Sequence, residues 1–198
     1  MMTEPQFASM NLVIFDLETT GWSPRYCEII QIAAVRMLHG EIIADDSFET
    51  FVRAQNAIPN HIFTLTGISP SDVDTAPEPS TALAAFSNFV GDATIVAHNG
   101  RRFDLGFIRE NCERSQLPMR EVPFFDSLSL SRLLWPDAHS HGLDAVIERL
   151  GLSNEGLHRH NARDDVRLLA EAVRQMWQRL DSPFDRCPVP VETGHLPR

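Results

Sequence analysis

Residues 28–38 read EIIQIAAVRML, a mostly apolar run rich in branched side chains, and His39-Gly40 ends it. Another apolar run precedes it at residues 12–15, and a third follows at residues 41–52. A two-residue break between apolar runs is typical of a tight turn that joins two antiparallel strands. The sequence therefore predicts an antiparallel meander of strands at its beginning.

Helical periodicity dominates the remainder of the chain. Leu83, Phe86 and Val90, for example, recur at the spacing of a helix that buries one face. We expect short strands at 94–97 and around 124–125, and helices at 103–110, 127–135, 143–150 and 161–180. The expected strands at the start of the chain, followed by alternating strands and helices, predict an α/β fold. Its mixed central sheet, an antiparallel meander and then parallel strands, is flanked by helices.

The length of 198 residues favours one domain with a sizeable core. We place this domain at residues 1–180. From Asp181 onward four prolines remove any periodicity, so residues 181–198 are expected to form an extended or poorly ordered tail.

Composition narrows the class of protein. No apolar run approaches the length of a membrane span, and residues 1–10 lack a signal-peptide pattern, so we expect a cytoplasmic protein without a membrane partner. The three cysteines form no CxxC pair, which argues against a thiolate zinc site. The net charge of −10 argues against a large electrostatic nucleic-acid binder. It argues less against an enzyme whose metal ions meet the phosphate locally.

A first pair of acids closes the first strand. Because side chains alternate along a strand, Asp16 and Glu18 share one face while Leu17 points to the other. Adjacent carboxylates repel each other unless a cation lies between them, and a hard divalent ion prefers oxygen ligands. A solvated strand end with capping acids is the alternative explanation.

A third acid lies on an apolar helical face. Asp104 shares that face with Phe107 and Ile108, and an inward acid costs several kcal/mol unless it is paired or bound to metal. A salt bridge with Arg101 or Arg102 is the alternative. We interpret the preceding His98 as a hydrogen-bonded structural residue rather than a base.

The longest helix opens with a histidine and two acids. Asn161 is the expected N-cap, and Asp164 has a capping role near the helix amides. Asp165 lies on the same stripe as Leu169 and therefore points inward. His160 precedes the helix, where its ring suits proton transfer near neutral pH. Taken alone, it could equally be an exposed loop histidine.

Together these motifs resemble the DEDDh branch of the DnaQ-like 3′→5′ exonucleases, which have a ribonuclease-H-like fold. The resemblance covers roughly residues 12–177. It rests on FDLETTG at 15–21, AHNGRRFD at 97–104 and the H-x4-D spacing from His160 to Asp165, with LTGI at 65–68 and FDSLSLSRLLWP at 125–136 in support.

The resemblance implies a mechanism and a set of site residues. Asp16, Glu18, Asp104 and Asp165 would hold two Mg²⁺ or Mn²⁺ ions, and His160 would be the general base. The substrate would be a DNA or RNA strand with a free 3′ end, and the product a nucleoside 5′-monophosphate. The residues implied to pack around the terminal nucleotide are Leu17, Thr19, Thr20, Leu65 and Phe103.

Several alternatives stay open at this point. The chain could be a proofreading subunit with a polymerase partner, or a ribonuclease that trims RNA. A catalytically dead nucleic-acid-binding module and a metal phosphoesterase for small molecules are further alternatives. The sequence leaves the oligomeric state, including a homodimer, undecided. Trp22 is expected to stack on a base or to pack within its loop. Four arginines are expected to steer the strand or to form a solvated surface: Arg101, Arg102, Arg159 and Arg163.

Overall fold

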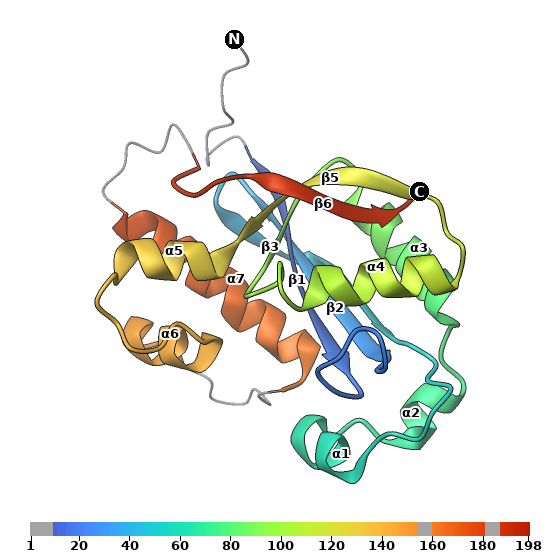
Figure 1. Cartoon of the computed structure of the whole chain (residues 1–198). Helices are drawn as coiled ribbons and strands as arrows, with labels where there is room; N and C mark the ends of the chain where they lie inside the picture. Colours follow the sequence, from blue (N-terminus) through green and yellow to red (C-terminus); the bar gives the residue numbers. More distant parts are fainter. Residues whose placement is uncertain (1–9, 154–159, 181–186) are drawn as a thin grey trace.

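A computed structural model describes residues 10–153, 160–180 and 187–198, which form a mixed sheet covered by helices on both faces (Figure 1). The sheet has six strands in the order β3-β2-β1-β4-β5-β6. Their bounds are β1 Asn11–Thr19, β2 Ile29–Leu38, β3 Glu41–Phe51, β4 Thr94–Ala97, β5 Met119–Asp126 and β6 Glu192–Pro197. Strands β1, β4 and β5 are parallel to one another, while β2, β3 and β6 run antiparallel to their neighbours.

The meander forms where the sequence predicts it. Leu38 of β2 pairs with Glu41 of β3, and the two residues between them have positive φ angles, 53° at His39 and 79° at Gly40. Positive φ at both central residues matches the right-handed twist of the strands that the turn joins. The turn therefore places β2 and β3 side by side at one edge of the sheet.

The described residues form seven helices, of which five cover the faces of the sheet (Figure 1). Their bounds are α1 Asn60–Thr66, α2 Pro70–Asp74, α3 Pro79–Val90, α4 Asp104–Arg114, α5 Ser127–Leu134, α6 Leu143–Leu150 and α7 Ala162–Arg179. Figure 1 shows α5, α6 and α7 on one face and α3 and α4 on the other. None of these helices is long and apolar enough to cross a membrane.

The side chains of β1 point alternately into the two cores, one on each face of the sheet. Leu12 and Ile14 lie in the core beneath α5, α6 and α7. Val13 and Phe15 lie in the core beneath α3 and α4. Because β1 is buried on both faces, it reads as a continuous apolar run, which is typical of a central strand. The α/β class, with a meander followed by parallel strands between helices, is confirmed.

Strand β6 was not indicated by the sequence. It lies in the segment expected to be an extended or poorly ordered tail and pairs along β5 from Phe124 to Met119. Leu196 is buried in the core beneath α3 and α4. A Cβ added at Gly194 would lie 3.3 Å from the Cβ of Phe124, so β6 packs closely against the sheet. Proline is tolerated at an edge strand, which is why the prolines of this segment did not prevent pairing.

Candidate metal and nucleic-acid site

Three acids converge where β1 ends. Asp16 and Glu18 are half-buried on the face of β1 that α7 covers, and Asp165, in the first turn of α7, is 5% exposed. One carboxylate oxygen from each of the three lies within 4.8 Å of the others. Such a set of oxygen donors is compatible with a divalent metal ion. The structure thus brings together three acids that are separated by up to 149 positions in the sequence.

The start of α7 is fixed to the sheet by polar contacts. The side chain of Asn161 accepts a hydrogen bond from the N–H of Arg163 at 3.1 Å, so the predicted N-cap is confirmed. The N–H of Ala162 donates to Oε1 of Gln31 at 3.1 Å, and Gln31 is fully buried on β2 opposite Glu18. Gln31 therefore ties the helix terminus that carries Asp165 to the strand beside Glu18.

Gln31 was missed by the sequence analysis. The only signal was one amide among the apolar residues of IIQIAAV at 29–35. A buried polar side chain must find partners, and Gln31 does so by accepting from Ala162 and donating to Glu49 at 3.3 Å.

His160 lies directly beside the three acids. Its backbone N–H donates to Oδ2 of Asp165 at 3.1 Å, and its φ angle is 63°. The left-handed backbone turns the chain into α7 and leaves the half-buried side chain of His160 lining the same hollow as Asp16, Glu18 and Asp165. The imidazole is thus placed within a site of carboxylates without itself being needed to hold Asp165.

Asp104 differs from the other three acids. It is the first residue of α4, it is 2% exposed, and its Oδ1 has no hydrogen-bond partner among the described residues. Burial raises its pKa to about 7, and the negative charge of Asp126 acts in the same direction, while the N–H groups of Asp104 itself and of Leu17 lower the pKa. The hydrogen bond from Leu17 places Asp104 against the backbone between Asp16 and Glu18. An unpartnered buried oxygen at that position is suited to serve as a ligand of a cation.

The alternative explanation for Asp104, a salt bridge with Arg101 or Arg102, is not observed among the described residues. Arg101 pairs with Glu192 at 2.9 Å, and within the described residues neither Arg101 nor Arg102 forms an ion pair with Asp104. The turn before α4 is instead held by Asp126, whose carboxylate accepts from the N–H of Asn99 at 2.8 Å and of Arg101 at 3.2 Å. Asp126 lies in the motif FDSLSLSRLLWP, but the sequence analysis assigned it no role.

A hollow of about 400 Å³ lies over the acids. Its lining includes the expected Leu17, Thr19, Leu65 and Phe103 together with Asp16, Glu18, His160 and Asp165. Thr20 does not line the hollow: its Oγ1 accepts from the N–H of Glu28 at 2.9 Å and closes the β1–β2 loop. Asp104 lies beneath rather than along the lining.

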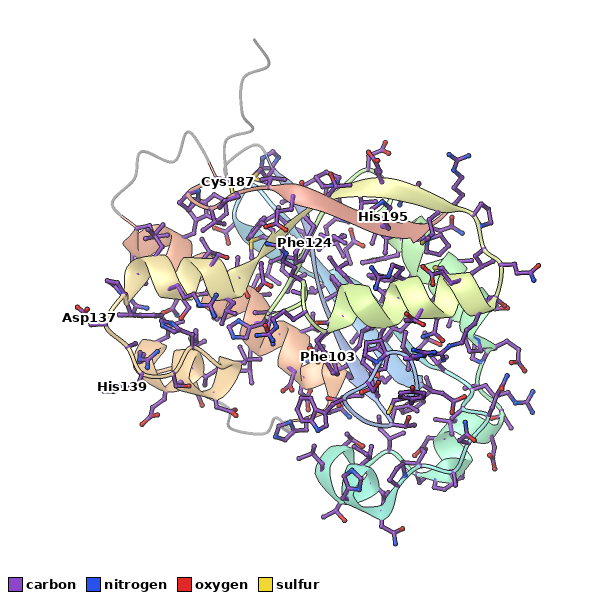
Figure 2. The ribbon with its side chains drawn as sticks, viewed as in Figure 1. Phe103, Phe124, Asp137, His139, Cys187 and His195 are labelled. Atoms are coloured by element: carbon purple, nitrogen blue, oxygen red, sulfur yellow. The ribbon has the colours of Figure 1, made fainter. Side chains whose placement is uncertain are left out.

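Apolar side chains form the rim of this hollow. Trp22 is 82% exposed, and its ring lies 5.7 Å from the ring of Phe103 in an edge-to-face contact. Leu65, 44% exposed, is carried by α1. Figure 2 shows Phe103 where the chain enters α4. These surfaces are suited to the faces of a nucleobase.

The loop histidines have structural contacts. Nδ1 of His98 lies 2.9 Å from Oγ of Ser127, and its Nε2 lies 2.7 Å from the carbonyl oxygen of His141. Both ring nitrogens are therefore engaged, which supports the structural interpretation of His98. His141 in turn contacts Ser131 at 2.9 Å. His139 is exposed on the loop between α5 and α6 (Figure 2).

Comparison with known proteins agrees with this geometry. Residues 13–173 match the family model RNase_T, described as exonuclease. The chain is 38% identical over 173 residues to DNA polymerase III PolC-type of Clostridium perfringens (strain 13 / Type A), which covers 87% of this chain but 12% of that protein. The chain therefore spans about an eighth of the length of this curated relative.

Solved structures share the fold. Exonuclease X in complex with 5′ overhanging duplex DNA has a TM-score of 0.69 at 24% identity, covering 88% of this chain and 96% of that one. A 3′-exonuclease described by its 3′-end specific recognition of a histone mRNA stem-loop has a TM-score of 0.70 at 20% identity, covering 86% and 82%. With the family model matched over most of its length, the chain belongs to the RNase_T exonuclease family, whose DnaQ-like, ribonuclease-H-like character the sequence motifs predicted.

Proposed function

We propose that this exonuclease domain removes nucleotides one at a time from the 3′ end of a DNA or RNA strand and releases nucleoside 5′-monophosphates. The observation that carries the proposal is the convergence of Asp16, Glu18 and Asp165 within 4.8 Å, together with the buried Asp104, which accepts a backbone hydrogen bond from Leu17 and has one oxygen without a partner among the described residues. No other described group of three or more metal-ligand side chains is as close.

The four acids are proposed to hold two Mg²⁺ or Mn²⁺ ions. Two such ions would supply positive charge that stabilises the negative charge of the phosphodiester during hydrolysis. Asp16 lies on the strand, Asp165 on the helix that packs against it, and Asp104 beneath both. The protein thus contributes a rigid frame of oxygen donors from three separate elements.

His160 is proposed as the general base. It lines the hollow, and its backbone N–H donates to Asp165. The imidazole is proposed to take the proton of the attacking water. The water oxygen forms the new bond to phosphorus, the bond from phosphorus to the 3′-oxygen of the preceding nucleotide breaks, and a 5′-monophosphate leaves.

The terminal nucleotide is proposed to occupy the hollow of about 400 Å³. Leu17, Thr19, Leu65 and Phe103 would contact it directly, while Thr20 would act by holding the loop. Trp22 offers a stacking surface at the rim. The solved relative described as a 3′-exonuclease supports the polarity.

A polymerase context is the second candidate. The relative from Clostridium perfringens is a DNA polymerase, and this chain matches one part of it. We propose that the chain works beside a polymerase as a proofreading exonuclease, with an RNA-trimming role as the alternative. Removal of a mismatched 3′ nucleotide faster than a paired one would favour proofreading. A cytoplasmic location stays a prediction from the sequence alone, and the sequence leaves the oligomeric state undecided.

A time course on labelled oligonucleotides tests the proposal. Matched DNA and RNA oligomers, single-stranded and duplex, are incubated with Mg²⁺ or with EDTA, with either the 5′ or the 3′ end blocked. We expect a ladder that shortens from the 3′ end, stops when that end is blocked and requires the metal. Hydrolysis of mononucleotide esters with none of oligomers would instead indicate a small-molecule phosphoesterase.

A further inference from the structure

A second hollow lies beside the β1–β2 loop and contains none of the acids of the first. It measures about 380 Å³ between that loop, the start of α4 and strand β6. Its lining residues are Pro24, Arg101, Arg102, Leu105, Gly106, Arg109, Glu192, Thr193, Gly194 and His195. We call it the α4–β6 groove. Figure 1 shows α4 and β6 running alongside each other, and Figure 2 shows His195 on β6 above α4.

Cations gather in this groove although the chain carries a net charge of −10. Arg102, in the turn before α4, and Arg109, on α4, are both exposed and both line the groove. Of the described residues that line the groove, Glu192 alone is acidic, and it pairs with Arg101 at 2.9 Å. Arg109 lies 3.9 Å from Glu113, which is outside the lining, and an exposed pair of this kind contributes little. Arg102 therefore gives the groove a positive charge that no described lining residue balances.

The spacing of the two arginines suits an extended polyanion. Arg102 lies in the turn just before α4, and Arg109 lies within the helix, five residues after Asp104; five residues of helix rise about 7.5 Å along the axis. That rise alone exceeds the span of one phosphate group, so two guanidinium groups would contact different phosphates of one strand. Arginine presents planar donors that bind phosphate oxygens in pairs.

The groove adjoins the site of the acids. Phe103 and Trp22 line the first hollow, while the neighbouring Arg102 and Pro24 line the second. Because consecutive Cα atoms are about 3.8 Å apart, the Cα of Arg102 lies within about 8 Å of that of Asp104. The loop is seated firmly between the hollows: a Cβ on Gly106 would lie 3.2 Å from Cγ of Pro24, and Arg114 donates to the Pro24 carbonyl.

We propose that the α4–β6 groove binds the phosphodiester backbone of the substrate strand a few nucleotides inside its 3′ end, through Arg102 and Arg109. This inference rests on the proposed function, since it assigns a path to the strand whose terminus occupies the first hollow. It gives the acidic protein a local means of holding a polymer rather than a single nucleotide.

The test compares Arg102→Ala/Arg109→Ala with Arg132→Ala, which removes an exposed arginine from α5 on the other side of the sheet. Binding of a fluorescent 20-nucleotide single strand is measured by anisotropy in EDTA, where hydrolysis is blocked, over a range of salt concentrations. We expect the double variant to bind about tenfold more weakly. The slope of log affinity against log salt should fall by about 1.4, because each single-strand phosphate contact contributes about 0.7. The control should match the wild type.

Kinetics on substrates of two lengths separate the groove from the proposed function. In Mg²⁺, KM for the 20-mer should rise about tenfold in the double variant while turnover of a dinucleotide stays unchanged. If the double variant and the control have equal affinity and equal KM for the 20-mer, the proposed role of the groove is wrong. It is also wrong if the double variant loses as much activity on the dinucleotide as on the 20-mer. If the wild type binds the 20-mer through these arginines but hydrolyses nothing, the proposed function fails while the groove stands.

Discussion

The four acids of the site fall into two unlike parts. Asp16, Glu18 and Asp165 lie within 4.8 Å of one another along an open hollow, and Asp16 and Glu18 remain partly exposed. Asp104 lies alone beneath them, 2% exposed, with one oxygen unpartnered among the described residues. The first part is assembled by β1 and α7, the second by the turn between β4 and α4.

Residues with one proposed role can thus have very different surroundings. Asp16 and Glu18 remain partly exposed, whereas burial raises the pKa of Asp104 to about 7. Without a cation, Asp104 therefore carries a proton over much of the acidic range. Metal binding at this site should then release that proton, because a ligand carboxylate must be deprotonated.

The largest effect is expected from the open cluster. Asp165→Asn or Asp16→Asn removes a charged ligand that nothing nearby replaces, so turnover of an oligonucleotide should fall at least about a thousandfold, since metal charge stabilisation supplies several kcal/mol. Gel-resolved product formation measures the loss. Asp137→Asn, an exposed acid on the loop between α5 and α6 (Figure 2), is the matched control and should retain wild-type turnover. A fully active Asp165→Asn variant would remove that residue from the proposed ligand set.

His160 should matter next. His160→Asn keeps a residue that tolerates the left-handed φ of 63°, and it keeps the backbone donor to Asp165. Loss of a general base should lower kcat about 10²–10⁴-fold while metal affinity changes little. Titration calorimetry of Mn²⁺ binding, run beside the kinetics, separates the two effects. His139→Asn on the exposed loop serves as the control, and equal kcat in both variants would exclude the base role.

The buried Asp104 should make the free energy of unfolding depend on pH. Folded Asp104 has a pKa of about 7 and an unfolded aspartate about 3.9, so between these values the folded state binds the extra proton. The free energy of unfolding of the metal-free protein should therefore be highest near pH 4 and fall by roughly 4 kcal/mol as pH rises to 7, relative to Asp104→Asn. Urea unfolding of both proteins in EDTA from pH 4 to 8 measures the difference. Parallel curves would contradict the raised pKa.

The same argument predicts the response to metal. Above pH 7 Asp104 is ionised and needs no proton release, so Mg²⁺ or Mn²⁺ should raise the melting temperature more at pH 8 than at pH 6. In Asp104→Asn that pH dependence should largely disappear. An equal metal-induced shift at both pH values in the wild type would show that Asp104 takes no part in binding.

The sequence was sufficient for features that periodicity encodes. The parity of Leu12, Ile14 and Asp16 placed the first acids, and the stripe shared with Leu169 distinguished Asp165 from Asp164. The bounds of two short elements, β4 and α6, were also predicted as they are observed. Each of these features depends on side chains near one another in the chain, which local patterning can report.

Features that depend on distant partners were not predictable in this way. Strand β6 forms because β5 offers an edge, and neither alternation nor composition marks it. Gln31 acquires its role from Ala162, which is 131 residues away. The four arginines expected to act together divide: Arg101 and Arg102 lie in the α4–β6 groove, Arg163 pairs with Glu49 at 3.5 Å, and Arg159 lies outside the described residues.

The smallest expected effect concerns the support of the open cluster. Gln31→Leu keeps the volume of a buried side chain but leaves the N–H of Ala162 without its acceptor, which should lower the free energy of unfolding by about 1–3 kcal/mol. Because Ala162 begins the helix that carries Asp165, turnover should fall about tenfold while the pH dependence attributed to Asp104 persists. Gln175→Leu, which removes an amide bonded only locally to Glu171 on the same helix, is the control. A Gln31→Leu variant that lost stability but kept full turnover would show that the carboxylate cluster holds its geometry without this contact, so that β1 and the packing of α7 suffice to position Asp165.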